Sequence, residues 1–219
     1  MFSNEISPRK NYEATSARFA NVAFSDGSLL DSFLRRIQKR QPLAVPCDTR
    51  RYFVSLPEAG YICLLSAVCG PSNHLLIPKM NPENDLQNLQ SIAENILLHY
   101  GFKPHIFENE SKAKASLESD IKNGYYPLLV TQLDTSGEKP FEEFVGDGET
   151  VVDIGMSCLL GIIYMPAPLG TVSALLERCE DLIAHPDLPI TKGTFVQLMN
   201  SVLPHMRHRE TGKSLDEHM

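Results

Sequence analysis

The sequence lacks an excess of positive charge, a paired-cysteine motif and a long uninterrupted apolar run. Its 20 lysines and arginines against 27 aspartates and glutamates give a formal net charge of −7, which argues against a general binder of nucleic acid. The five cysteines form no C-x-x-C pair and no secretory segment is visible, so we expect reduced thiols in a cytoplasmic protein. The longest apolar stretch, residues 154–170, is interrupted by glycine and proline, so we expect no membrane insertion.

Signatures of a self-contained catalytic centre are also missing. The sequence has no G-x-S-x-G, no G-x-x-x-x-G-K-[ST] and no convincing Cys/His nucleophile pair. His205 and His208 have metal-like spacing, but they lack a Cys partner or an H-E-x-x-H pattern. We therefore expect no metal site and assign no catalytic residue.

The sequence does contain a regular alternation of strand-like and helix-like segments, which predicts the α/β class. The expected strands are 17–24, 51–55, 73–78, 104–107, 126–133 and 161–166. The expected helices are 28–40, 56–69, 86–97, 110–123, 171–184 and 194–203. Together they divide the chain into a polar lead-in (1–14), a main portion (15–206, with the helical segment 171–206) and a polar tail (207–219).

The clearest local signal is "ARFANVAFSDGSLL" (17–30), a strand that runs through a small polar turn into a helix. Ser28 with Asp31 three residues later is a plausible helix cap. Such a turn places backbone N–H groups and the positive end of the helix dipole together, which suits a phosphate. An ordinary strand–turn–helix with a well-made cap explains the same pattern.

Two other segments carry charges that a ligand could use. Arg50 and Arg51 stand just before an expected strand, where a guanidinium could clasp a phosphate or carboxylate, and a solvated pair is the alternative. Residues 134–149 form a turn-rich acidic stretch that contains Lys139. Its carboxylates could hold ribose hydroxyls or a divalent cation, whereas a solvated acidic loop is the simpler explanation.

Four segments in order change this picture: "ARFANVAFSDGSLL", "RRYFVSLPEAGYICLL", "IPKMNPENDLQNLQSIAENIL" and "LDTSGEKPFEEFV". Together they resemble the C-terminal half of the CapD-like polysaccharide-biosynthesis proteins. These are extended short-chain dehydrogenases that act on UDP-sugars, such as UDP-N-acetylglucosamine 4,6-dehydratases and related epimerases. The resemblance runs from Thr15 to the C-terminus. It implies the last strands of a Rossmann core plus a small α/β substrate lobe, without the N-terminal cofactor-binding half.

The resemblance also implies which residues hold the UDP-sugar. In the family, the strand like "RFANV" supplies an Asn beside the sugar diphosphate, and the turn like "SDGSLL" wraps the nucleotide. The phosphate-binding arginine best matches Arg51, with Arg50 as a possible substitute, and "TSGEKPFE" retains the family's Lys and Glu. The residues so implicated are Asn21, Ser25, Gly27, Ser28, Leu29, Arg50, Arg51, Lys139 and Glu142.

Two departures from the family limit what the resemblance implies. Thr135 replaces an arginine, and a lost charge-assisted hydrogen bond of about 1.5–3 kcal/mol would weaken pyrophosphate binding. The glycine-rich dinucleotide fingerprint and the Y-x-x-x-K pair are missing, since Ser16 stands where the lysine would follow Tyr12. We therefore expect no cofactor to be bound by this chain alone, with NAD or NADP belonging to the intact family enzyme.

The leading hypothesis is a UDP-sugar-binding portion of a nucleotide-sugar 4,6-dehydratase or epimerase of bacterial polysaccharide biosynthesis. It would act as a fragment, as a homo-oligomer, or as a subunit completed by a separate cofactor-binding chain. The alternative is a non-enzymatic interaction module derived from that family. An unrelated small α/β enzyme is the third reading.

Overall fold

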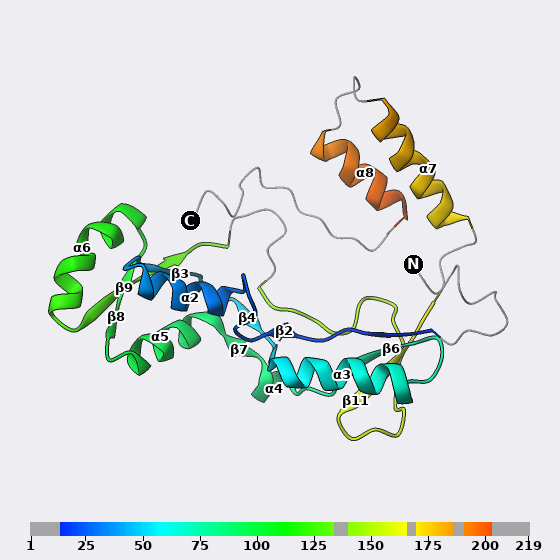
Figure 1. Ribbon diagram of the computed structural model, residues 1–219, viewed down its shortest axis with the longest axis horizontal. Coiled ribbons are helices and arrows are strands. Elements are labelled where there is room, and N and C mark those ends of the chain that lie inside the picture. Colours follow the sequence, from blue (N-terminus) through cyan, green and yellow to red (C-terminus); the bar gives the residue numbers. More distant parts are fainter. Residues whose placement is uncertain (1–13, 134–139, 166–169, 186–190, 203–219) are drawn as a thin grey trace.

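The computed structural model describes residues 14–133, 140–165, 170–185 and 191–202, and it has a mixed α/β architecture (Figure 1). The strands are β1 (Thr15–Ala17), β2 (Asn21–Val22), β3 (Leu43–Pro46), β4 (Arg50–Arg51), β5 (Phe53–Val54), β6 (His74–Pro78), β7 (Gln87–Asn88), β8 (Lys103–Phe107), β9 (Tyr125–Thr131), β10 (Val151–Val152) and β11 (Leu159–Ile163). The helices are α2 (Leu29–Gln38), α3 (Leu56–Cys69), α4 (Pro82–Asp85), α5 (Leu89–His99), α6 (Glu110–Lys122), α7 (Thr171–Ala184) and α8 (Lys192–Val202). The expected α/β class is confirmed.

One lobe is a parallel three-stranded sheet in the order β3-β9-β8, covered by α2, α5 and α6. Helix α6 joins β8 to β9, which is the usual crossover between neighbouring parallel strands. The lobe's core is built around fully buried side chains such as Phe33, Leu97 and Leu128. These three come from α2, α5 and β9, so the apolar faces of separate elements close on one another.

The second lobe is a four-stranded sheet in the order β1-β6-β11-β10, with α3 packed on β1 and β6. Strands β1 and β6 run parallel, whereas β11 is antiparallel to both β6 and β10. Its core contains Ile62, Leu76 and Leu159 from α3, β6 and β11. The sheet is therefore mixed, as expected where an antiparallel strand is added to a parallel pair.

Two small sheets lie between the lobes: β2 pairs with β5 in parallel, and β4 pairs with β7 in antiparallel fashion (Figure 1). Each has only two residues per strand. They bring residues that are distant in sequence to the junction of the lobes. The candidate site is built there.

Several expected elements are confirmed and some were wrong. The helices 56–69 and 171–184 have the expected bounds. The single strand expected over 17–24 is instead two short strands, because β1 pairs with β6 while β2 pairs with β5. The expected strand 51–55 is likewise divided, with Arg50–Arg51 pairing to β7 and Phe53–Val54 pairing to β2. Strand β3 was not predicted.

Helix α3 is apolar on nearly all of its surface. Ala59, Ile62 and Ser66 are buried, whereas Tyr61 and Val68 are 64% and 72% exposed. Ser55 caps the helix, and Glu58 bonds back to its backbone N–H at 2.6 Å, which completes a capping box. None of the helices in the described part of the chain is long and apolar enough to cross a bilayer.

The five cysteines all lie within the described residues, and none of them forms a disulfide in the structure. Cys63, Cys69 and Cys158 are exposed, and Cys47 and Cys179 are partly covered.

Candidate functional site

Three residues predicted to bind ligand meet at one place between the lobes. The Asn21 side-chain amide donates to Oε2 of Glu142 at 3.0 Å, and Nε of Arg51 lies 3.4 Å from Oε1 of the same carboxylate. The Arg51 side chain is only 18% exposed, whereas that of Glu142 is 44% exposed. An amide, a guanidinium and a carboxylate from three separate segments therefore converge at the protein surface.

Backbone pairing explains why these segments meet. Asn21 begins β2, and its N–H donates to the carbonyl of Tyr52 at 3.2 Å. Arg50 donates its N–H to the carbonyl of Pro140 at 2.8 Å and forms an isolated parallel bridge with Phe141. The residues before Glu142 are thus held along β4, so the carboxylate stands beside Arg51.

The two arginines divide their roles. Arg50 is exposed and anchors the neighbouring segment through its backbone. Arg51 is the one whose guanidinium reaches Glu142, and its Nη1 also donates to the Arg50 carbonyl at 2.8 Å. The phosphate-binding role of either arginine stays a prediction.

A ring contact holds the same segment two residues later. The rings of Tyr52 and Phe144 lie 4.8 Å apart at a tilt of 36°. Burial, together with the nearby charge of Asp85, raises the pKa of the Tyr52 phenol above its usual value. Tyr52 therefore stays neutral at ordinary pH, and its ring packs against that of Phe144.

A salt bridge fixes the far end of the segment. The Arg18 guanidinium donates two hydrogen bonds of 2.8 Å to the Glu149 carboxylate and a third to the Phe144 carbonyl. Glu149 also accepts from the Gly146 N–H. The hydrogen bonds from Arg18 lower the pKa of Glu149, with the Gly146 N–H adding to the effect and partial burial opposing it.

A cavity of about 590 Å³ opens next to Glu142. Tyr52, Phe144 and Leu86 line it with other apolar side chains, and Glu142 and Glu143 supply carboxylates. Such an apolar hollow beside a few polar groups has the size and lining of a small-molecule site.

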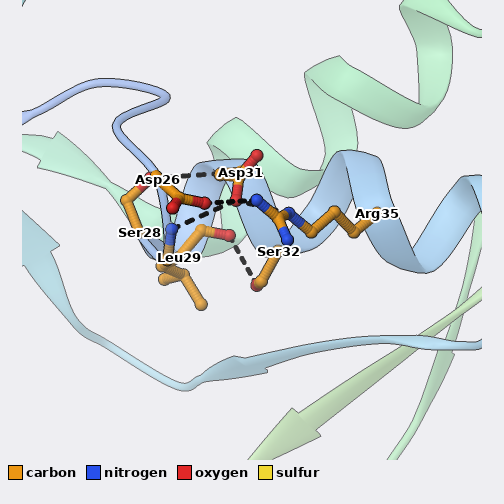
Figure 2. A network of polar contacts seen from close by, with 7 residues as sticks. Asp26, Ser28, Leu29, Asp31, Ser32 and Arg35 are labelled. Atoms are coloured by element: carbon orange, nitrogen blue, oxygen red, sulfur yellow. Dashed lines mark hydrogen bonds and ion pairs between the residues drawn. The ribbon is translucent and has the colours of Figure 1, made fainter.

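The turn before α2 lies on the same stretch of chain as Asn21, and the N–H groups of Gly27, Ser28 and Asp31 already have partners. Figure 2 shows Arg35 between the carboxylates of Asp26 and Asp31, and the Gly27 N–H donates to Oδ2 of Asp31 at 3.2 Å. Ser28 caps the helix as predicted, accepting from the Asp31 N–H at 3.2 Å. A phosphate at this turn would have to displace the Asp31 carboxylate from Gly27.

The other predicted residues of the turn have local roles in the structure. The Ser25 hydroxyl donates to the Val22 carbonyl at 3.0 Å, and Gly27 has φ +74°, a left-handed conformation that favours glycine. Leu29 begins α2 and its carbonyl accepts from the Ser32 hydroxyl at 2.7 Å. Their contact with a nucleotide stays a prediction. Lys139 lies outside the described residues.

Sequence reasoning missed the groups that hold the site together. Arg18 was only a polar exception within an expected strand, and Glu149 was one of several acids in an expected loop. Nothing in their spacing of more than a hundred residues indicated a pair. An arginine inside an apolar strand was the one available signal, because such a charge needs a partner when the strand packs.

The described residues do not fit a dinucleotide cradle. Gly146 and Gly148 have G-x-G spacing, but the element that follows them is the short strand β10 rather than a helix. A pyrophosphate cradle needs its glycines between a strand and a helix N-terminus. Across residues 14–133, 140–165, 170–185 and 191–202, no cluster of three His, Cys, Asp or Glu side chains could hold a metal ion.

Comparison with known proteins adds family and fold. The model of a family described as "Polysaccharide biosynthesis protein" matches residues 1–157. The X-ray structure of Pen from Bacillus thuringiensis is similar to this chain with a TM-score of 0.52 at 20% identity. The similarity covers 77% of this chain and 45% of the Pen chain, and at this identity it shows the fold alone. No curated protein sequence matches the chain.

Proposed function

Because the chain belongs to the polysaccharide biosynthesis protein family, we propose that it binds a nucleotide sugar, with Asn21 and Arg51 as donors to the diphosphate. The observation that carries this proposal is the meeting of both side chains on one carboxylate. Donors that converge on a pair of carboxylate oxygens also have the geometry to hold phosphate oxygens. Arg51 is largely covered, which makes its charge more effective than that of a solvated arginine.

The adjacent cavity favours a ligand that is more than a phosphate. Its apolar lining suits the ring faces and acetyl methyl group of an N-acetylated sugar, while the carboxylates of Glu142 and Glu143 can accept from sugar hydroxyls. A UDP-sugar such as UDP-N-acetylglucosamine combines an anionic centre with such a sugar. We therefore choose this nucleotide sugar as the first ligand to test.

The reaction belongs to the proposal as well. We place the chain in an NAD(P)-dependent 4,6-dehydratase or epimerase, in which the nicotinamide supplies hydride transfer. The residues described above would bind and orient the sugar nucleotide.

Calorimetric titration with UDP-N-acetylglucosamine tests the binding proposal. Arg51→Gln removes the charge-assisted donor, so we expect affinity to fall about tenfold or more. Arg50→Gln is the matched control on the neighbouring residue, and it should bind like the unaltered protein. Failure of the unaltered protein to bind at millimolar ligand, or equal losses in both variants, would contradict the proposal.

A second candidate function is the non-catalytic interaction module, with a second copy of this chain as partner. The apolar exposed face of α3, with Tyr61, Leu64 and Val68, favours it. The helix carries one acidic residue in its first turn and no basic residue in its last, so this face is nearly uncharged. Two copies can therefore approach along it although each chain has a net charge of −7. A strictly monomeric protein in sedimentation equilibrium at high concentration would exclude this candidate.

A further inference from the structure

The carboxylate of Glu142 occupies the two donors that the proposed function assigns to a diphosphate. Asn21 donates to Oε2 and Arg51 approaches Oε1, so each oxygen already has a partner. The protein thereby neutralises its own candidate anion site. An incoming phosphate must either replace this carboxylate or lie beside it as a like charge.

We propose that Glu142 is a displaceable internal anion that regulates this site: it holds Asn21 and Arg51 in place and yields them to a phosphate-bearing ligand. This inference rests on the proposed function for the identity of the natural ligand. The contact itself rests on the geometry alone.

Exposure favours displacement of Glu142 over displacement of Arg51. The Glu142 side chain is 44% exposed and can turn toward solvent, whereas the Arg51 side chain is only 18% exposed and has less freedom to move. An ion pair with a half-exposed partner is weak, while a phosphate brings more negative charge and more acceptor oxygens to the same donors. The exchange therefore favours the ligand.

The anchors on both sides explain how Glu142 can move without unfolding its segment. Pro140 and Phe141 are tied to Arg50 before it, and Phe144 is held by Tyr52 and Arg18 after it. The side chain between these anchors can change its rotamer while the backbone stays paired. The displaced carboxylate can then turn toward solvent, as the 44% exposure of the Glu142 side chain allows.

The neighbouring Glu143 provides a matched control for pyrophosphate, which has no sugar hydroxyls for it to contact. It is an exposed carboxylate on the same segment and lines the same cavity, but the donors of Asn21 and Arg51 point to Glu142. Glu142→Gln and Glu143→Gln each remove one negative charge close to the site. Only the first should weaken the hold on the donors, because the remaining amide oxygen of the glutamine is uncharged.

The experiment is calorimetric titration of the full chain and both variants with inorganic pyrophosphate, followed by the same titrations with UDP-N-acetylglucosamine. We expect Glu142→Gln to bind pyrophosphate about fivefold more tightly than the unaltered protein, and Glu143→Gln to stay within about twofold. Glu142→Ala, which cannot accept a hydrogen bond through its side chain, should gain at least as much. Thermal melting checks that each variant is folded.

Equal or weaker pyrophosphate binding by both Glu142 variants, an equal gain in Glu143→Gln, or no pyrophosphate binding by any variant would overturn the inference. The outcomes separate it from the proposed function. A gain for pyrophosphate without any UDP-sugar binding supports the displaceable carboxylate and removes the UDP-sugar proposal. If the unaltered protein binds the UDP-sugar but the Glu142 variants bind pyrophosphate no more tightly, the UDP-sugar proposal stands and the displaceable carboxylate is removed.

Discussion

Removing the charge of Glu149 should loosen the segment that carries the candidate site. Glu149→Gln keeps the size of the side chain but replaces one acceptor oxygen of the Arg18 pair with an amide donor. Arg18 would then lose a charge-assisted hydrogen bond and face an N–H group. Because Arg18 also holds the Phe144 carbonyl, the loss is transmitted to the residues beside Glu142.

The magnitude follows from geometry and exposure. A charge-assisted hydrogen bond contributes about 1.5–3 kcal/mol when buried, whereas a solvent-exposed ion pair contributes about 0.2–1 kcal/mol. The side chains of Arg18 and Glu149 are 38% and 28% exposed, so the pair lies between these limits. We expect Glu149→Gln to lower the free energy of unfolding by about 1.5 kcal/mol.

Urea denaturation followed by circular dichroism measures this loss. With a denaturant dependence of about 2.5 kcal/mol per molar urea, the midpoint should fall by about 0.6 M at neutral pH. Glu143→Gln on the same segment is the control and should leave the midpoint unchanged.

The pH dependence gives a second test with a definite sign. The pKa of Glu149 is lower in the folded protein than the ordinary glutamate value of 4.5, so the unfolded chain binds the proton more readily. The stabilisation is therefore fully present above about pH 4.5 and is lost as the pH falls through the lowered folded-state pKa. The unaltered protein and Glu149→Gln should differ in free energy of unfolding at neutral pH, and this difference should disappear at strongly acidic pH. A difference that persists unchanged in acid, or that is absent at neutral pH, would refute the reasoning.

Two further predictions concern stability. Ser28→Ala removes the hydroxyl that accepts from the Asp31 N–H and should lower the free energy of unfolding by about 1 kcal/mol in a urea titration, with a smaller loss for Ser28→Gly. Equal stability of the unaltered protein and both variants would contradict this role of Ser28. In β11, Gly161→Ala places a methyl group 2.7 Å from the Ile154 side chain and should lower the free energy of unfolding by about 1–3 kcal/mol. In α3, Gly60→Ala meets open space and should raise it by about 0.5–1 kcal/mol. The opposite order of the two urea midpoints would refute this prediction.

The longer elements could be predicted because their signals are local. In α3, three residues near the beginning carry local signals: the structure shows Ser55 as the cap, Pro57 in the first turn and Glu58 completing the capping box. The start of α5 was harder to locate, because Asn84 and Asp85 look like caps but belong to the short helix α4. Asn88 is the residue that caps α5.

The short strands at the junction could not be predicted from local patterns. A strand of two residues, such as β2 or β4, has no periodicity to recognise, and its existence depends on a partner elsewhere in the chain. The apolar appearance of residues 17–24 suggested one strand, although β1 and β2 pair in different sheets.

The sequence by itself determined the α/β class, the long helices, and the two charged segments where ligand binding was expected, because these depend on residues near one another in the chain. The tertiary structure decided that Asn21 and Arg51 both contact the carboxylate of Glu142. It also decided that Arg18 pairs with Glu149, and that the helix N-terminus at Gly27 is occupied by Asp31. The contacts with Glu142 and Glu149 join residues about a hundred positions apart and arise only when the strands pair, and the contact at Gly27 forms only when the turn closes onto α2.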